Sequence, residues 1–186
     1  MQWFSLKKNI DKVVWEPFSG NPCAIHVLEK HQDKIVWKRL SGNTNTAVLP
    51  LLERNLDKVD WNELSDNPVA IPLLEKHPDK IHWKRICTNT NGISLIEKNL
   101  DKPLDWHFLS GVPEAIHILE KHTDKIHWDL LNWGNTKAMS LIQRHPNKID
   151  YEELSHNPSI FTTNHDEMKR IKQQWYHSMC GVVPHT

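Results

Sequence analysis

Histidine and cysteine are the side chains of this 186-residue sequence with the clearest capacity for metal chemistry. Zinc is bound where such side chains converge at bonds of about 2 Å. Four of the 13 histidines instead recur at one position of a repeated pattern, and packed helices lie about 8–10 Å apart, too far to share one ion. These four are His31, His77, His122 and His145. The trio His177, Cys180 and His185 has a loosely metal-like spacing but lacks a fourth ligand, so we expect no metal site.

The cysteines do not form a pattern typical of an enzyme or of a disulfide framework. Cys23, Cys87 and Cys180 are far apart and odd in number, which indicates reduced thiols in an intracellular protein. Cys23 and Cys87 occupy repeat positions that otherwise hold small residues, so we expect both thiols to be buried or partly buried. The sequence has no glycine-rich phosphate-binding loop. We therefore predict that the protein is not an enzyme and needs no cofactor.

The nine tryptophans could stack on nucleotide bases or on a ligand, but most of them are regularly spaced. Six recur at intervals of 22, 24, 22, 23 and 22 residues, and a tyrosine follows after 23 more. Asp-Lys pairs recur in register with them. An aromatic residue that returns in every repeat is expected to be a structural anchor of the core. The anchors are Trp15, Trp37, Trp61, Trp83, Trp106, Trp128 and Tyr151.

Each repeat carries signals for two helices. An asparagine followed by proline, as in Asn67-Pro68, predicts the N-cap and first residue of the longer helix. That helix is expected to stop at an asparagine or histidine such as His77, for which we predict a left-handed backbone with positive φ. The shorter helix begins at the aromatic residue, where Asp60 and Glu63 resemble a capping box.

These signals predict an all-α fold. We expect an α-solenoid of about seven repeats of 22–24 residues, each with a short helix plus a longer helix, because neither helix is long enough to be stable alone. The solenoid is placed over residues 1–162 and opens with a partial repeat at residues 1–14. Residues 163–186 are predicted to form a C-terminal capping helix and a tail within the same domain.

The segment Leu64–Lys76, with the sequence LSDNPVAIPLLEK, is similar to the short repeats of about 22 residues in helical-repeat proteins of giant DNA viruses. The similarity covers nearly the whole chain and is specific for the type of repeat. Those proteins are mostly uncharacterised, so the resemblance implies a viral origin and a place in the virion or the infected cell, but no activity. In architecture alone, the unit also resembles a shortened HEAT-type helix pair.

Charge and hydropathy narrow the classes of partner. The 23 basic and 23 acidic residues cancel, whereas a dedicated nucleic-acid-binding protein usually carries a basic surplus. The N-terminus lacks the apolar stretch of a signal peptide, and no run approaches the roughly 18 apolar residues of a membrane span. We therefore expect an intracellular protein that is neither secreted nor bound to membranes, and the resemblance to viral repeat proteins implies the host cytoplasm or the virion as its place.

Positions at which the repeats differ are the candidates for partner binding, because shared positions serve packing. After the aromatic residue, Lys38-Arg39 and Lys84-Arg85 recur two repeats apart and suggest a basic patch, with a solvated charged face as the simpler interpretation. The same variable positions hold His107 and Phe108 in another repeat.

Two further kinds of position are candidates. A mid-helix position without large apolar residues holds His26, Ser94 and His117, among others, and predicts an exposed groove wall. Trp133 lies in an insertion and is the tryptophan that we expect to be exposed, although packing is the simpler role for it as well.

The predicted architecture favours a non-enzymatic protein–protein interaction module that binds a host or viral protein along the solenoid surface. The alternative is a structural component of a large DNA virus particle, such as a minor capsid or spacer protein. A nucleic-acid-binding solenoid with one repeat per base is disfavoured by the zero net charge.

Overall fold

A computed structural model describes residues 9–161, and these residues form an all-α structure without a strand. The all-α prediction is therefore confirmed. The chain divides between Leu109 and Ser110 into two compact units, called here the first and the second unit. Trp3 and Phe4 of the predicted partial repeat, and the predicted capping helix at residues 163–186, lie outside the described residues. The placement of one continuous domain over residues 1–162 stays a prediction.

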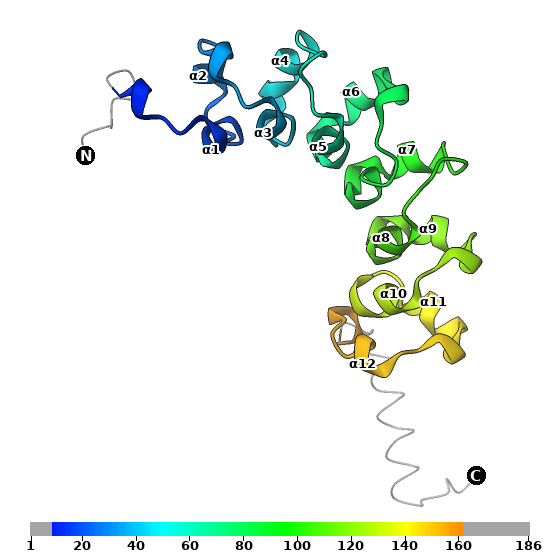
Figure 1. Cartoon of the computed structure of the whole chain (residues 1–186). Helices are drawn as coiled ribbons and strands as arrows, with labels where there is room; N and C mark the ends of the chain where they lie inside the picture. Colours follow the sequence, from blue (N-terminus) through cyan, green and yellow to red (C-terminus); the bar gives the residue numbers. More distant parts are fainter. Residues whose placement is uncertain (1–8, 162–186) are drawn as a thin grey trace, which may run out of the picture. The chain divides into compact units, whose positions relative to one another are not determined.

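The first helix of a repeat begins at the aromatic residue, as predicted (Figure 1). These helices are α1 (Trp15–Ser19), α3 (Trp37–Ser41), α5 (Trp61–Asp66), α8 (Trp106–Gly111), α10 (Trp128–Gly134) and α12 (Tyr151–Leu154). After Trp83 the corresponding segment is a 3-10 helix, η7 (Ile86–Thr88). The second helices are α2 (Ile25–Leu28), α4 (Leu49–Glu53), α6 (Ile71–Lys76), α7 (Ile93–Glu97), α9 (Ile116–Leu119) and α11 (Met139–Arg144).

Both kinds of α-helix are short, so the predicted contrast between a short and a longer helix is not present in the α-helical segments themselves. The second helix gains length from a 3-10 turn that directly precedes it in four repeats: η4 (Thr46–Val48), η5 (Pro68–Ala70), η8 (Thr90–Gly92) and η9 (Pro113–Ala115). Asp-Lys segments form a third, unpredicted element, the 3-10 turns η2 (Ile10–Lys12), η3 (Gln32–Lys34), η6 (Pro78–Lys80) and η10 (Thr123–Lys125). The equivalent Asn-Lys segment is η11 (Pro146–Lys148), and η12 (Pro158–Phe161) ends the described chain. Helices of this length require tertiary packing for stability.

The helices α6 and α11 end directly before the predicted residues His77 and His145, and the other second helices end one or two residues further ahead of theirs, but the predicted left-handed backbone is not present. His77 has φ −131° and His145 has φ −127°, so the prediction of positive φ is wrong. The chain passes from these residues straight into the next 3-10 turn. Side chains, rather than a left-handed residue, satisfy the helix end. Asn55 and Asn99 donate through Nδ2 to carbonyl oxygens four residues earlier at 2.9 Å, and His145 Nδ1 lies 2.9 Å from Leu141 O.

Leucines rather than tryptophans occupy the centre of the core. The leucine three residues after the aromatic residue is fully buried in four repeats, at Leu40, Leu64, Leu109 and Leu131. The tryptophans proposed as anchors are half-buried, and Tyr151 is 75% exposed. The aromatic residue therefore covers the edge of the core, where a large ring removes apolar surface from water without needing full enclosure.

Within each unit, the first helices of successive repeats pack on one another. In the first unit α1 contacts α3, α3 contacts α5, and α5 contacts η7, while α10 contacts α12 in the second unit. Figure 1 shows α1, α3 and α5 in one row of the first unit, with α2, α4 and α6 in a second row. The short first helices thus present a continuous face within a unit, on which residues one and two positions after the aromatic residue lie.

Gly92 compensates for the presence of Ile86 in the core. The residue three positions after the repeat's asparagine is alanine at Ala24, Ala70 and Ala138, but glycine at Gly92. A Cβ atom at Gly92 would lie 2.8 Å from Ile86 Cγ1. Ile86 replaces the leucine of the other repeats, so its branched Cβ needs the space that the alanine methyl group takes elsewhere.

Candidate interaction surface

In five of the repeats, a buried asparagine six or seven residues after the aromatic residue hydrogen-bonds the repeat to the preceding one. Asn67 donates through Nδ2 to the carbonyl oxygens of Ser41 and Asn43, both at 2.9 Å, and accepts from the Val69 N–H at 3.1 Å. The equivalent bonds recur in both units, in the asparagine series Asn43, Asn67, Asn89, Asn135 and Asn157. Each amide satisfies backbone groups that have no helical partner, and the loss of such buried bonds costs about 1–3 kcal/mol per group.

A small polar side chain four residues after the aromatic residue makes a second link. Ser65 Oγ donates to Trp61 O at 2.7 Å and accepts from the His82 N–H, in the next repeat, at 2.9 Å. This serine series comprises Ser19, Ser41, Ser65, Cys87, Ser110 and Asn132. Asn132 departs from the others, because its Nδ2 donates to Trp128 O and Lys148 O, and its buried Oδ1 has no partner among the described residues.

Only part of this framework follows from the sequence. Asn67 and Asp60 are N-caps as predicted, since each accepts backbone N–H groups at the start of a helix. The cross-repeat role of the asparagine, and any role for the serine, were missed, although the serine position follows the aromatic residue by four residues and the asparagine by six or seven. In the 24-residue repeat the two roles are divided, because Asn43 donates to Ser19 O across the repeats while Asn45 is the N-cap of η4 and accepts from the Ala47 N–H.

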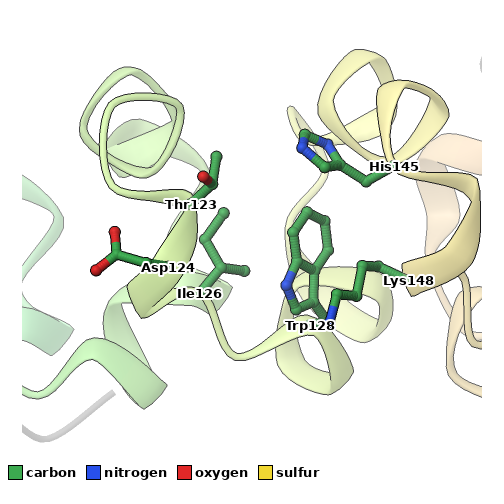
Figure 2. Close-up of a pocket in the computed structure, with 6 residues that line it drawn as sticks. All are labelled: Thr123, Asp124, Ile126, Trp128, His145 and Lys148. Atoms are coloured by element: carbon green, nitrogen blue, oxygen red, sulfur yellow. The ribbon is translucent and has the colours of Figure 1, made fainter.

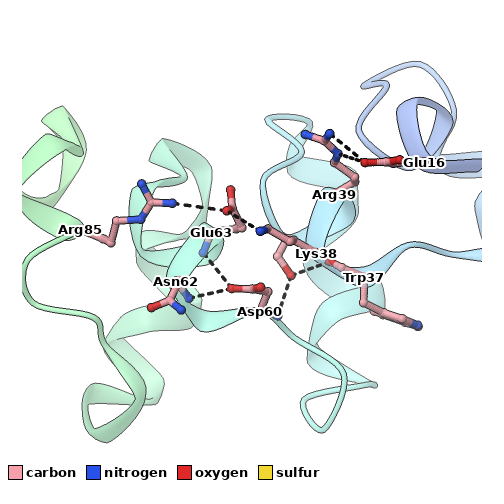
Figure 3. Close-up of polar contacts among 9 residues, drawn as sticks. Glu16, Trp37, Lys38, Arg39, Asp60, Asn62, Glu63 and Arg85 are labelled. Carbon is pink, nitrogen blue, oxygen red and sulfur yellow. Dashed lines mark hydrogen bonds and ion pairs between the residues drawn. The ribbon is translucent and has the colours of Figure 1, made fainter.

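The predicted basic residues of the first unit lie among carboxylates (Figure 3). Arg39 Nη2 lies 2.9 Å from Glu16 Oε1 of the preceding repeat. Lys38 Nζ and Arg85 Nη2 lie 3.8 Å and 3.3 Å from the same oxygen, Glu63 Oε1. Three of the four basic side chains are thus paired across repeats, and only Lys84 of the set is exposed without an ion pair within residues 9–161. The arrangement matches a solvated, charge-balanced face better than a basic patch.

The other predicted residues do not form a common site. His26 and Ser94 are exposed on second helices and His117 is half-buried there, away from the first-helix face. His107 and Phe108 are neighbours on α8, with ring centroids 5.4 Å apart, and Phe108 is 50% exposed.

Trp133 is the exposed tryptophan of the described chain, as predicted. It lies in the last turn of α10 with 51% of its surface exposed. Asp129, Leu130 and Trp133 of α10 and Glu153 of α12 line a surface cavity of about 310 Å³. The residues of α10 are three and four positions apart, a spacing that places them on one helix face. The described residues therefore give the cavity one aromatic ring, one aliphatic side chain and two carboxylates on packed neighbouring helices.

The carboxylates of this surface lack the cations that accompany those of the first unit. Asp129, Glu152 and Glu153 form no ion pair within the described part of the chain. Other carboxylates of the second unit are paired, because Lys137 Nζ lies 3.2 Å from Glu114 and Arg144 contacts Glu120. The Glu114 backbone N–H, together with Lys137, lowers the pKa of the Glu114 carboxyl. The first-helix face of the second unit is thus acidic around an exposed indole.

A second cavity of the same unit lies beside a tryptophan–histidine pair (Figure 2). The rings of Trp128 and His145 have centroids 5.0 Å apart, and the cavity of about 390 Å³ is also lined by Thr123, Asp124, Ile126 and Lys148. The pair recurs as Trp15–His31 and Trp61–His77, with centroids 5.6 Å and 5.4 Å apart. A feature that returns in several repeats is best explained as packing within the repeat.

The cysteines divide between exposed and buried positions. Cys23 is exposed, so the prediction for it is wrong, because the neighbouring Ala24 takes the core position. Cys87 is buried as predicted, and burial raises the pKa of its thiol to about 11, which keeps it protonated and unreactive near neutral pH. Within residues 9–161 no three metal-ligating side chains converge, and His177, Cys180 and His185 lie outside the described residues.

Comparisons of the chain with protein-family models, with curated proteins and with solved structures found no match. Of the helices in the described residues, none is both long enough and apolar enough to cross a membrane.

Proposed function

We propose that the chain is a non-enzymatic repeat protein that binds a protein partner through the surface around Trp133. The observation that carries the proposal is the 51% exposure of this indole in a cavity with Leu130 and two carboxylates. Tryptophan is enriched among the residues that dominate binding energy at protein interfaces. The other described tryptophans are half-buried, so Trp133 departs from the role that the repeat gives this residue type.

The proposal includes an α-solenoid of about seven repeats. The recurrence of the asparagine and serine series in both units supports this architecture, because each bond links one repeat to its neighbour. The resemblance to repeat proteins of giant DNA viruses supports a viral origin and a place inside the infected cell. The buried thiol of Cys87 is compatible with a reducing compartment.

A virion structural component is the second candidate. The buried cross-repeat hydrogen bonds favour it, since they stiffen the link between neighbouring repeats, as a spacer requires. Mass spectrometry of purified particles separates the candidates: a stoichiometric amount of the chain in the particle favours the structural role. Binding of nucleic acid loses support, because Lys38, Arg39 and Arg85 are paired with carboxylates.

The experiment for partner binding compares the full chain with its Trp133→Ala variant. Each is used to capture proteins from an extract of the cells that express the chain, and captured candidates are purified and titrated by calorimetry. We expect one candidate to bind the full chain at least about 10-fold more tightly than the variant, the effect of removing an interface hot spot. Circular dichroism checks that the variant is folded. Equal binding by both proteins would contradict the proposed surface.

A further inference from the structure

The surface around Trp133 has side chains suited to a positively charged partner group. Asp129 and Trp133 are four residues apart on α10, and Glu153 comes from α12, which packs against α10. Two carboxylates and an indole that line the same cavity offer a cation two attractive charges and an aromatic ring. The cavity volume of about 310 Å³ lies at the lower end of the range for ligand sites, which suits one long side chain rather than a large cofactor.

In the first unit, one equivalent carboxylate and one tryptophan each lie beside a cation of the chain. In the first unit Glu63, which occupies the same repeat position as Glu153, contacts both Lys38 and Arg85. Lys58 Nζ lies 5.1 Å from the centroid of the Trp37 ring, so the chain itself places an ammonium group on a tryptophan. At the surface around Trp133, the described residues supply neither kind of cation to Asp129, Trp133 or Glu153.

We propose that Asp129, Trp133 and Glu153 bind a lysine or arginine side chain presented by a basic segment of the partner protein. This inference rests on the proposed function and gives the partner a chemistry. Charge complementarity selects a basic segment over an acidic one, and Leu130 contacts the methylene groups of the incoming side chain. An alternative occupant is the chain's own residues 162–186, which include Lys169, Arg170 and Lys172.

The test is a titration of the ¹⁵N-labelled full chain with a capped peptide of alternating glycine and arginine, followed by NMR. The indole N–H resonance of Trp133 is assigned from its loss in the Trp133→Phe variant. We expect a saturable shift of this resonance that weakens as salt is added, since exposed charges are screened. The matched peptide of alternating glycine and glutamate is expected to leave the resonance unchanged.

Variants of the two cavity carboxylates test whether the arginine peptide binds at this surface. Asp129→Asn and Glu153→Gln are each expected to raise the apparent Kd about 3-fold, as the loss of one exposed charge pair does, and the double variant about 10-fold. The control is Glu63→Gln, which removes the carboxylate at the same repeat position in the first unit and is expected to leave the Kd unchanged. Fold is checked in every variant from the dispersion of the backbone resonances.

Three results would overturn the inference. These are an absent or non-saturable shift, an equal shift with the glutamate peptide, and a Kd that the two carboxylate variants leave unchanged. A rise in affinity for the arginine peptide after Lys169→Gln, Arg170→Gln and Lys172→Gln would identify the chain's own segment as the occupant and contradict a partner. If a captured partner depends on Trp133 but binds through an apolar or acidic segment, the proposed function stands while this inference fails.

Discussion

The first-helix faces of the two units use the same repeat positions for opposite purposes. In the first unit, Glu16 and Glu63 are balanced by basic side chains of neighbouring repeats. In the second unit, Asp129 and Glu153 lie beside an exposed indole without an ion pair in the described part of the chain. Ion pairs on this face are therefore not required for the fold, because the described residues of one unit form them and those of the other do not.

Exposed ion pairs contribute less to stability than the buried hydrogen bonds of the asparagine series, which explains why the charges of this face can differ between the units. An exposed ion pair contributes about 0–1 kcal/mol, so its loss is easily tolerated. A buried amide that satisfies several backbone groups contributes more, and the asparagine series recurs in both units. The repeat asparagine is replaced at Val112, in the repeat through which the division between the units passes.

Two asparagine variants, for which we expect the largest loss of stability, test whether both units depend on the asparagine series. Asn67→Ala and Asn135→Ala each remove two donated bonds and one accepted bond from buried backbone groups. We expect each variant to lower the free energy of unfolding by about 3 kcal/mol, measured by urea denaturation. A cost well below about 1 kcal/mol in either unit would show that its asparagine is not needed there.

Tryptophan truncation separates the framework from the exposed surface. Trp61 is half-buried and its ring contacts the His77 ring edge-on, so Trp61→Ala is expected to cost about 2 kcal/mol, less than for a fully buried tryptophan. Trp133→Ala, at an exposed position, is expected to cost below about 1 kcal/mol. Thermal unfolding of both variants gives the comparison, and equal costs would mean that Trp133 is a packing residue.

The units also differ at the serine position, where the first holds Cys87. Because burial raises the pKa of this thiol to about 11, the unfolded state releases its proton at lower pH than the folded state. Stability is therefore unaffected below about pH 8 and falls as the pH rises through 9 to 11, by about 2 kcal/mol for this group.

Cys87→Ser is the matched variant for this effect, since serine fills the same position at Ser65. We expect the variant to be as stable as the natural chain at pH 7 and to lose less stability at pH 11, measured by urea denaturation at both values. An identical alkaline loss in both proteins would assign it to lysine and tyrosine titration instead.

The smallest expected effect concerns the charges of the two faces. Glu63→Gln removes the shared partner of Lys38 and Arg85 and is expected to cost about 0.5 kcal/mol. Glu153→Gln removes a carboxylate that is close in sequence to Glu152 and has no ion pair within residues 9–161, so the free energy of unfolding should stay the same or rise slightly. Urea denaturation at low salt resolves the two signs, and a loss of stability in Glu153→Gln would reveal an unrecognised cation beside it.

The periodic features could be predicted from the sequence, but the contacts between neighbouring repeats could not. The helix start at Trp61, the caps Asp60 and Asn67, and the exposure of Trp133 follow from local patterns. The bonds from Asn67 to Ser41 O and Asn43 O, and the pairing of Lys38 with Glu63, join residues 24 to 26 positions apart. Only the geometry between repeats brings such residues together.

The sequence also did not predict how deeply the tryptophan rings are buried or which backbone angles the residues at the helix ends adopt. A recurring tryptophan marks the face of a helix that packs, but not how deeply the ring is enclosed, and the tryptophans lie at the edge of a leucine core. The end of a helix can be capped by a left-handed residue or by a side chain, and His145 uses its ring nitrogen. For this position, residue type alone does not distinguish the two.

We propose that the face around Trp133, and not the equivalent face of the first unit, binds the partner. Photocrosslinking tests it most directly, with a photoreactive residue placed at Asp129 or, as the matched control, at Asn62, which is also exposed one position after its tryptophan. We predict that the purified partner crosslinks to the chain labelled at position 129 and not to the chain labelled at position 62. Equal crosslinking at both positions, or crosslinking at position 62 alone, would contradict the claim.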